Sequence, residues 1–430
     1  MRTASVVIAC AVATTLAAPS ARAADQTRPG AGNVAAVRLA SGSPLVVSAR
    51  RTLEHHAERI RQPELRRATI DAIANHDSCV RHRAGVADGD KDALVQQLVD
   101  AKLINLADAA TIGGGARAGV FPPLVDDGGA CPRLPQRFWS APGSGSGGHH
   151  SYPGGLVVHE TINLLSDLHL AATYRRVYGH ARADGLPEVD GELEAWLTRP
   201  DVAIDEDVMV AAPIWHDWAK PIVFQWNADG SEFSELNFGG TGSNDAWGGA
   251  GDSRTGAHHI LGVAEAMARG LAPDFVVTQA SAHAPPTYGN EYKVVNWLRA
   301  AAILARLDPV ARGYLRVDGK GRLRLPALRA LGEIDLNAAG QPNLLVEYGL
   351  HNLSDADFVL SGPALATAEL LLRTLAPELG HDPAAADYVV AFRNPALSYL
   401  SAERLLMLYG NGGLAAVRAE LQRLHTRGIL

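Results

Sequence analysis

Segments with the apolar spacing of α-helices cover most of this sequence, and this periodicity is the feature that most restricts its fold. Apolar residues that recur at intervals of three and four mark one buried face of a helix. Such segments are expected at about 44–75, 90–110, 156–178, 205–219, 257–269, 274–282, 291–307, 364–376, 397–408 and 414–424. Pro63 should divide the first of them into two helices. The sequence therefore predicts a mainly α-helical protein.

A spacing of two is confined to one region. Ile222–Trp226 and Phe233–Phe238 alternate, and Asp229-Gly230 lies between them. An Asp-Gly pair between two such runs predicts a β-hairpin. We expect a small hairpin insertion in the helical fold. Together with the Gly-rich stretch that follows it, the hairpin should form a mobile cover over the functional site, from Pro221 to Gly256.

The first 23 residues have the pattern of a signal peptide. Arg2 precedes the apolar run Ala4–Ala17, and Ala21-Arg22-Ala23 is a cleavage signal. The run is shorter than the roughly 20 residues that cross a bilayer, and no later segment reaches that length without charges. We expect a periplasmic or secreted protein without a membrane span.

Two cysteines remain after that cleavage. Cys10 would leave with the signal peptide, and Cys79 and Cys131 would stay. An even number in an oxidising compartment predicts one disulfide. The loop it closes, of about 50 residues, would stabilise the fold by roughly 4 kcal/mol.

The charge balance restricts the partners. The formal net charge is -7, and no block of lysines and arginines interrupts it. A nucleic acid polymer is therefore excluded as a partner, because such binding needs a basic surface. A small molecule is the expected ligand.

The residues suited to metal chemistry lie mainly in the middle of the chain. The sequence has 16 histidines, and several stand beside aspartate or glycine at the ends of expected helices. Imidazole and carboxylate together suit Mn, Fe, Co, Ni or Zn. The candidates are His149, His150, His159, His216, Asp217, His258, His259, His283 and Asp308.

This ordered series resembles the HD-domain superfamily of metal-dependent phosphohydrolases. The resemblance rests on His149-His-Ser-Tyr-Pro-Gly-Gly-Leu-Val-Val-His159, on His216-Asp-Trp-Ala-Lys220 and on the later histidines and aspartate, within about 149–308. It implies a helical bundle whose histidines and aspartates converge on one or two divalent ions. Three positions depart from the family pattern, namely Glu160, Pro213 and Ala219.

The resemblance also implies a role for each matching residue. The expected metal ligands are His159, His216, Asp217, His258, His283 and Asp308. The residues alone do not separate His258 from His259, and the resemblance selects His258. Lys220, with His149 or His150, would bind phosphate, and Asp217 would bridge the metals and orient the nucleophile.

The favoured function is an exported hydrolase that cleaves a phosphoester of a small molecule or nucleotide with one or two ions of Fe, Mn, Ni or Zn. Two alternatives stay open: an HD-type di-iron oxygenase, and a degenerate metal-binding protein without turnover. The expected organisation is a helical cap at 24–140, the HD-type domain at 141–312 and a helical extension at 313–430.

Overall fold

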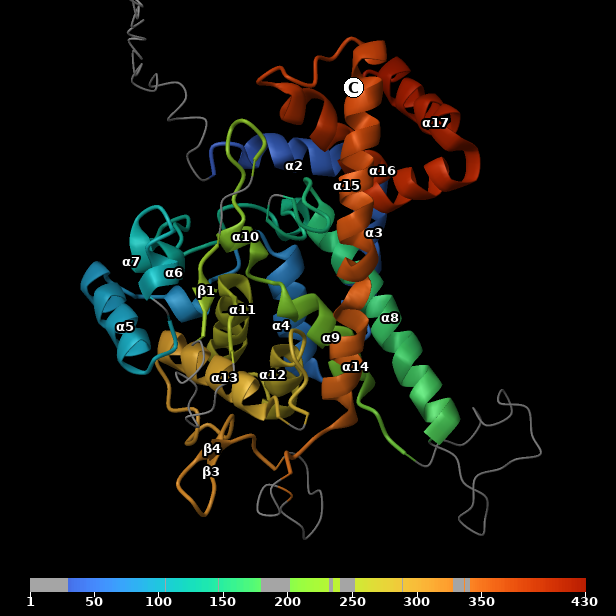
Figure 1. The fold of residues 1–430 in the computed structure, drawn as a ribbon. Coiled ribbons are helices and arrows are strands. Elements are labelled where there is room, and N and C mark those ends of the chain that lie inside the picture. Colours follow the sequence, from blue (N-terminus) through green and yellow to red (C-terminus); the bar gives the residue numbers. More distant parts are fainter. Residues whose placement is uncertain are drawn as a thin grey trace, which may run out of the picture.

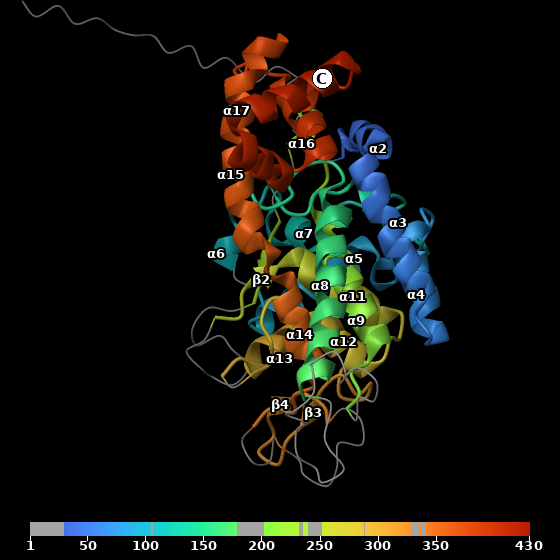
Figure 2. The same cartoon turned by 90° about the vertical axis from the view of Figure 1, so that its right-hand side faces the viewer.

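The computed structural model describes residues 30–104, 106–145, 147–178, 202–231, 235–239, 252–287, 289–327, 336 and 341–430. Helices dominate these residues, and the strands are short (Figures 1 and 2). The prediction of a mainly α-helical protein is confirmed. The signal peptide predicted for 1–23 lies outside the described residues.

The first helices begin at signals visible in the sequence. They are α2 (Asn33–Gly42), α3 (Pro44–Glu58) and α4 (Pro63–Ala74). The Ser43 hydroxyl accepts a hydrogen bond from the amide of Val46, and Pro44 occupies the first turn of α3. Pro63 begins α4, so the expected break at this proline is confirmed.

A disulfide anchors the next part of the chain. This part contains η1 (Arg81–Arg83), α5 (Asp88–Asp100), α6 (Leu106–Ala109), α7 (Gly115–Val120) and η2 (Phe138–Ser140). Cys79 and Cys131 are bonded, with their Cα atoms 5.0 Å apart. The predicted pairing is confirmed, and a disulfide is typical of an oxidising compartment.

One hydrophobic core joins the N-terminal and central helices. The central ones are α8 (Gly155–Tyr178), α9 (Glu206–His216), α10 (Lys220–Val223), α11 (Ala257–Ala268), α12 (Pro273–Ala280), α13 (Glu291–Ala305) and α14 (Val346–Ser354). Helix α8 packs against α3, α9 and α14, and α11 packs against α13. Because Leu53, Leu156 and Leu350 belong to the same core, the boundaries expected at 140 and 312 do not separate independent cores.

The β-structure differs from the expected hairpin. Residues 220–223 form α10, and Phe233 lies outside the described residues. The observed pairing is antiparallel, between β1 (Asn237–Phe238) and β2 (Thr255–Gly256). A second pair, β3 (Arg316–Val317) with β4 (Leu323–Arg324), was not expected. The hairpin prediction is wrong for 222–223, which belong to α10. Every side chain of 222–226 is buried, so the alternation there did not mark two sheet faces. Most of the proposed mobile cover lies outside the described residues.

The C-terminal helices form a second apolar cluster. They are η5 (Asp355–Asp357), α15 (Phe358–Leu375), η6 (Ala376–Leu379), η7 (Val389–Arg393), α16 (Asn394–Leu400) and α17 (Ala402–Thr426). Helix α15 packs against α17, and α14 and α15 follow one another along the molecule (Figure 1). The short η5 between them contacts α8. This contact brings the C-terminal part of the chain to the start of α8.

One stretch in this part, Val346–Leu379, is long and apolar enough to cross a membrane by length and composition alone. In the fold it contains Asp355 and Asp357, whose carboxylates pair with histidines. The prediction that the chain has no membrane span stays a prediction.

Candidate metal centre

A tightly folded loop sets the start of α8 and thereby the position of His159. The amide of Gly143 donates to the carbonyl of His150 at 2.9 Å, which closes the loop. A Cβ atom on Gly155 would lie 1.9 Å from the same carbonyl oxygen, so only glycine fits there. His159 follows in the second turn of α8 and is buried.

The His216-Asp217 pair stands at the C-terminal end of α9, and the neighbouring Trp215 and Trp218 fix its position. Trp215 and Trp218 are fully buried, and their indole N–H groups donate to a hydroxyl and a carbonyl oxygen of α4 at 3.0 Å each. Buried indole groups need such partners, which fixes both rings. The turn that carries His216 and Asp217 is therefore anchored to the core on both sides.

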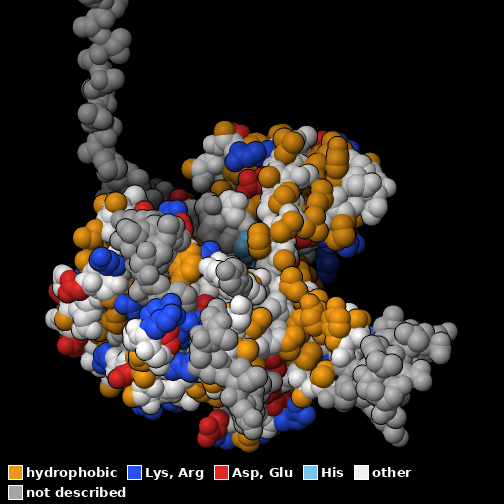
Figure 3. Space-filling view, turned by 60° about the horizontal axis from the view of Figure 1, so that its bottom comes forward, with side chains coloured by type: hydrophobic (Ala, Val, Ile, Leu, Met, Phe, Trp, Pro, Cys, Tyr) orange, Lys and Arg blue, Asp and Glu red, His pale blue; other side chains and the backbone are white. Residues whose placement is uncertain are grey.

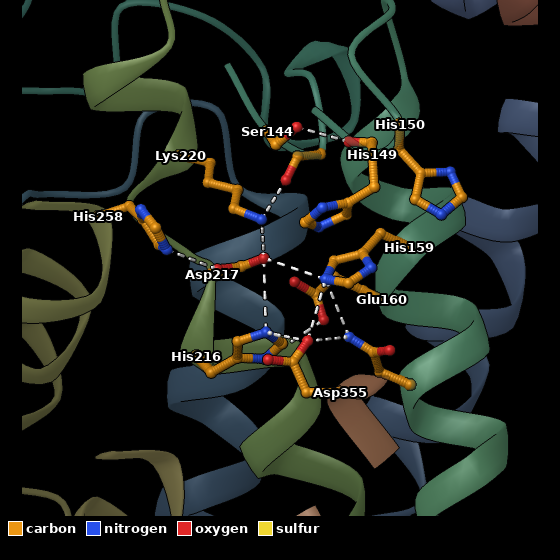
Figure 4. A network of polar contacts seen from close by, with 12 residues as sticks. Ser144, His149, His150, His159, Glu160, His216, Asp217, Lys220, His258 and Asp355 are labelled. Atoms are coloured by element: carbon orange, nitrogen blue, oxygen red, sulfur yellow. Dashed lines mark hydrogen bonds and ion pairs between the residues drawn. The ribbon is translucent and has the colours of Figure 1, made fainter. Parts of the chain in front are cut away.

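Four side chains meet in a ring above this turn (Figure 4). The Nε2 atom of His159 lies 3.3 Å from Oδ2 of Asp217 and 3.3 Å from Oδ1 of Asp355. The Nε2 atom of His216 lies 3.4 Å from Oδ2 of Asp217 and 3.3 Å from Oδ1 of Asp355. Two imidazole nitrogens and two carboxylate oxygens thus alternate around one point.

The spacing of this ring fits a metal ion. Two ligand atoms that each lie about 2.1 Å from one ion at a tetrahedral angle are about 3.4 Å apart. The four separations between neighbouring atoms of the ring agree with that value. The buried Nε2 atom of His216 also has no hydrogen bond of suitable geometry among the described residues. Buried polar atoms without a partner are costly, and an ion would satisfy this one.

A second group of possible ligands shares Asp217 with the first. Nε2 of His258 lies 3.2 Å from Oδ1 of Asp217, and His283 also offers a ring nitrogen within 4.8 Å of these groups. Asp217 therefore turns Oδ2 toward the ring of four and Oδ1 toward the second group. This arrangement suits a carboxylate that bridges two ions.

The outer nitrogens of three of these histidines face oxygen acceptors. Nδ1 of His159 lies 3.0 Å from the carboxylate of Asp357, and Nδ1 of His258 lies 2.7 Å from that of Glu235. Nδ1 of His216 lies 2.9 Å from the carbonyl oxygen of Pro213. An N–H donated at Nδ1 leaves Nε2 free as a lone-pair donor, which is the usual arrangement of metal-binding histidines.

The protonation states of the histidines and carboxylates in the centre depend strongly on one another. Burial alone would lower the pKa of His216, but Asp217, Glu160 and Asp355 outweigh burial and raise this pKa to about 10. Burial alone would raise the pKa of Asp355, but His216 and His159 hold it well below its ordinary value. Without an ion, the carboxylates are thus ionised and the facing imidazoles retain protons, which an ion would displace.

Glu160 is buried beside His216, with Oε2 at 3.5 Å from its Nδ1 atom. Burial raises the pKa of Glu160 to about 8. It belongs to one of the groups that can hold an ion, together with His159, His216 and Asp217.

A pocket of about 550 Å³ opens over the centre. Its floor includes Asp217 and Asp355, and its sides include Lys220, His149 and His258. Lys220 is buried, and its ammonium group donates to Asp217 and to the carbonyl oxygen of Gly143. A small molecule that enters this pocket reaches both groups of possible ligands.

Several predicted site residues lie together, and two do not. The structure brings His159, His216, Asp217, His258 and His283 to one place, with Lys220 and His149 beside them. His259 is turned away, with Nε2 at 3.2 Å from the carbonyl oxygen of Ala280. The choice of His258 over His259 thus agrees with the geometry.

Two predictions need correction. Asp308 is exposed, and its Oδ1 accepts hydrogen bonds from the amides of Val310 and Ala311, so it ends a turn and lies outside the centre. His150 was expected to bind substrate, but it is fully buried and does not line the pocket. Its Nε2 lies 2.9 Å from Asp357 and its Nδ1 lies 3.1 Å from the hydroxyl of Tyr152.

The sequence alone missed the carboxylates that complete the centre. Asp355 and Asp357 lie in η5, which was assigned to a helical extension, and Glu235 follows residues outside the described set. The signal that was available is the Asp355-Ala-Asp357 pair after a helix that contains Glu347 and His351. Two carboxylates two residues apart at a helix end were as good a candidate as Asp308.

Comparisons with protein family models, with curated proteins and with solved structures found no match to this chain.

Proposed function

We propose that this chain is an exported HD-type metal-dependent hydrolase that cleaves phosphoesters of small molecules. The observation that supports this proposal most is the arrangement around Asp217. His159, His216 and His258 each turn Nε2 toward one of its carboxylate oxygens, at 3.2 to 3.4 Å. Asp355 closes the ring, whereas Asp308, which the family resemblance matched to the last aspartate, lies outside it.

The residues that line the pocket can bind and orient a phosphoester. A divalent ion at such a centre lowers the pKa of bound water and polarises a phosphoryl oxygen. Asp217 accepts hydrogen bonds and can orient the attacking water. Burial, together with His159 and Lys220, lowers the pKa of His149 to about 2, so its neutral ring can donate an N–H to a phosphoryl oxygen without adding charge. Lys220 supplies the positive charge.

In the proposed reaction, water adds to phosphorus and the P–O bond to the leaving alcohol breaks. The alcohol oxygen takes up a proton, and the phosphate product keeps the oxygen of the water. His258 is fixed by Glu235 and lies beside Asp217 at the edge of the pocket, so its ring orientation is defined before substrate binds. Fixed groups of this kind lower the barrier because they need no reorganisation during the reaction.

The chain contains its own matched control for the first test. His76-Asp77 repeats the dipeptide His216-Asp217, but both of its residues are exposed on the surface. We expect purified wild-type protein to contain a divalent metal and to hydrolyse bis(p-nitrophenyl) phosphate. The variant His216→Ala should lose both properties, and His76→Ala should keep both.

The same assays separate the alternatives. Metal content without turnover of any phosphoester would support a degenerate metal-binding protein. Iron in the wild type together with consumption of oxygen would support the oxygenase. Wild-type metal content and turnover in His216→Ala would contradict a centre built on the His-Asp turn.

A further inference from the structure

The pocket over the metal centre has two chemically different sides. One side carries Asp217, Lys220 and His258, which face the phosphoester in the proposed function. The other side is formed by Leu353, Ala356 and Phe358, at the junction of α14, η5 and α15. These three residues are exposed to solvent, so they present apolar surface to whatever occupies the pocket.

Two phenyl rings border the histidines of the pocket. The ring of Phe358 lies 6.3 Å from that of His149, and the ring of Phe224 lies 5.9 Å from that of His258. Both phenylalanines line the pocket. An apolar group attached to a phosphate at the centre would therefore meet aromatic surface on leaving the polar floor.

The apolar side of the pocket continues onto the outer face of α15. Val359, Leu360 and Leu370 are 68%, 59% and 67% exposed, and residues 358–368 include no charged side chain. Figure 3 shows apolar side chains gathered on the molecular surface. Those of α14 and α15 belong to the outer face of α15 described above. Leu353, Ala356 and Leu360 follow one another at helical spacing, so the pocket wall and the outer face form one stripe. We call Leu353, Ala356, Phe358, Val359 and Leu360 the apolar stripe.

The charges of the pocket restrict the polar part of its ligand. Among the described residues that line the pocket, Lys220 is the single lysine or arginine, and it already pairs with Asp217. A di- or triphosphate group carries several negative charges and is usually bound by several cations. The pocket therefore suits a single phosphate group.

We propose that the substrate is an amphiphile, a phosphoester of one phosphate group with an alkyl chain that lies along the apolar stripe. This inference rests on the proposed function and names the substrate class of the same site. The stripe is continuous with the pocket, which is why we assign it to the substrate rather than to a second copy of the chain. Aliphatic side chains offer no hydrogen bonds to the edge of a nucleobase, which favours an alkyl chain over a nucleoside.

Three phosphodiesters with the same leaving group test this proposal. They are the methyl, octyl and thymidine 5′-esters of p-nitrophenyl phosphate, used below the concentration at which the octyl ester forms micelles. In each, water adds to phosphorus, the bond to p-nitrophenolate breaks, and the methyl, octyl or thymidine phosphate remains. We expect kcat/KM to rise by about fourfold for each methylene that reaches the stripe. The octyl ester should therefore exceed the methyl ester by tenfold or more.

The variants use a matched control. Leu360→Ser alters the stripe, and Met407→Ser alters an equally exposed apolar residue on α17, since both side chains are 59% exposed. Leu360→Ser should lower the octyl-to-methyl ratio of kcat/KM by threefold or more, and Met407→Ser should leave it unchanged. Equal rates for octyl and methyl esters, or a preference for the thymidine ester, would overturn the proposal.

Binding measurements separate failure of this inference from failure of the proposed function. Calorimetry with octyl phosphate and with inorganic phosphate measures how much the apolar stripe contributes to binding affinity, without any turnover. Tighter binding of octyl phosphate that is weakened by Leu360→Ser supports the amphiphile even if no ester is cleaved, and equal binding of the two overturns it. A dimer in sedimentation that Leu360→Ser dissociates would instead assign the stripe to self-association.

Discussion

Replacing Asp355 by asparagine tests the composition of the metal centre most directly, because the sequence pointed to a different aspartate. Asp355 faces both His159 and His216 through one carboxylate oxygen, at 3.3 Å each. Asparagine keeps the shape and one oxygen but removes the negative charge that favours a divalent ion. Asp308→Asn is the matched control, because Asp308 is exposed and only caps a turn.

The expected size of the effect follows from its position. Loss of an outer partner of a metal-binding histidine weakens metal binding by roughly 10 to 100-fold. Loss of charge on a ligand atom itself should reach or exceed about 100-fold, which corresponds to about 3 kcal/mol of metal-dependent stability. Asparagine caps turns about as well as aspartate, so Asp308→Asn should change stability by a few tenths of a kcal/mol, roughly.

Two measurements give the answer. Metal content of the purified proteins reports occupancy, and urea unfolding with and without a chelator reports the stability that the metal adds. Asp355→Asn should lose the chelator-sensitive part of its stability, and Asp308→Asn should retain it. A variant Asp355→Asn with wild-type metal content would refute the ring of four, and loss of metal in Asp308→Asn would restore the aspartate that the sequence favoured.

Further predictions concern the surroundings of the centre. Asp357→Asn removes the negative charge that lies 3.0 Å from Nδ1 of His159 and should weaken metal binding by about 10 to 100-fold in chelator competition; unchanged affinity would show that Asp357 does not position His159. Lys220→Met should keep the metal and lower phosphoester turnover by about 10 to 150-fold, since a charge-assisted contact contributes roughly 1.5–3 kcal/mol; loss of metal would contradict this role. The pKa of His216, raised to about 10 without an ion, gives stability that is fully present below about pH 6.5 and lost as pH rises through 10. An ion must displace that proton and the one on His159, so metal affinity should rise by at least about tenfold per pH unit between pH 6 and 8. Calorimetry at several pH values would show this, and a flat profile would contradict it. The double variant of Cys79→Ser and Cys131→Ser should lower the free energy of unfolding by roughly 4 kcal/mol in urea, and free thiols in the oxidised wild type would contradict the bond.

Local features of the sequence could be predicted because they depend on local physics. The break at Pro63, the helix that carries His159 and the turn at His216-Asp217 follow from backbone geometry and helical spacing within a few residues. The disulfide followed from the two cysteines that lie outside the predicted signal peptide. Each of these needs no knowledge of which distant segments pack together.

The wrong prediction for Asp308 has its cause in long-range packing, which the local sequence does not reveal. An aspartate that caps a turn and an aspartate that faces the histidines of a candidate metal site both stand at a helix end, and the local sequence does not distinguish them. Asp308 is followed by Pro309, and its carboxylate satisfies backbone amides within three residues. Asp355 reaches His159 and His216 only because α14 packs against α8 and α9, a contact that depends on the whole core. The error at 222–223 has a similar cause, because complete burial there removed the polar face that would have revealed the short helix α10.

The position of Asp355 also gives the C-terminal part of the chain a role in the centre. Asp355 and Asp357 stand in η5, directly before α15, and α15 is held by its packing on α17. His150 links Asp357 to the same region, since its Nδ1 lies 3.8 Å from the carboxylate of Glu403 in α17. The C-terminal helices thus hold the carboxylates against the histidines, so a chain ended near residue 312 would keep the His-Asp turn but lose the acids that complete its ring. The part that the sequence presented as an extension is therefore required for the centre.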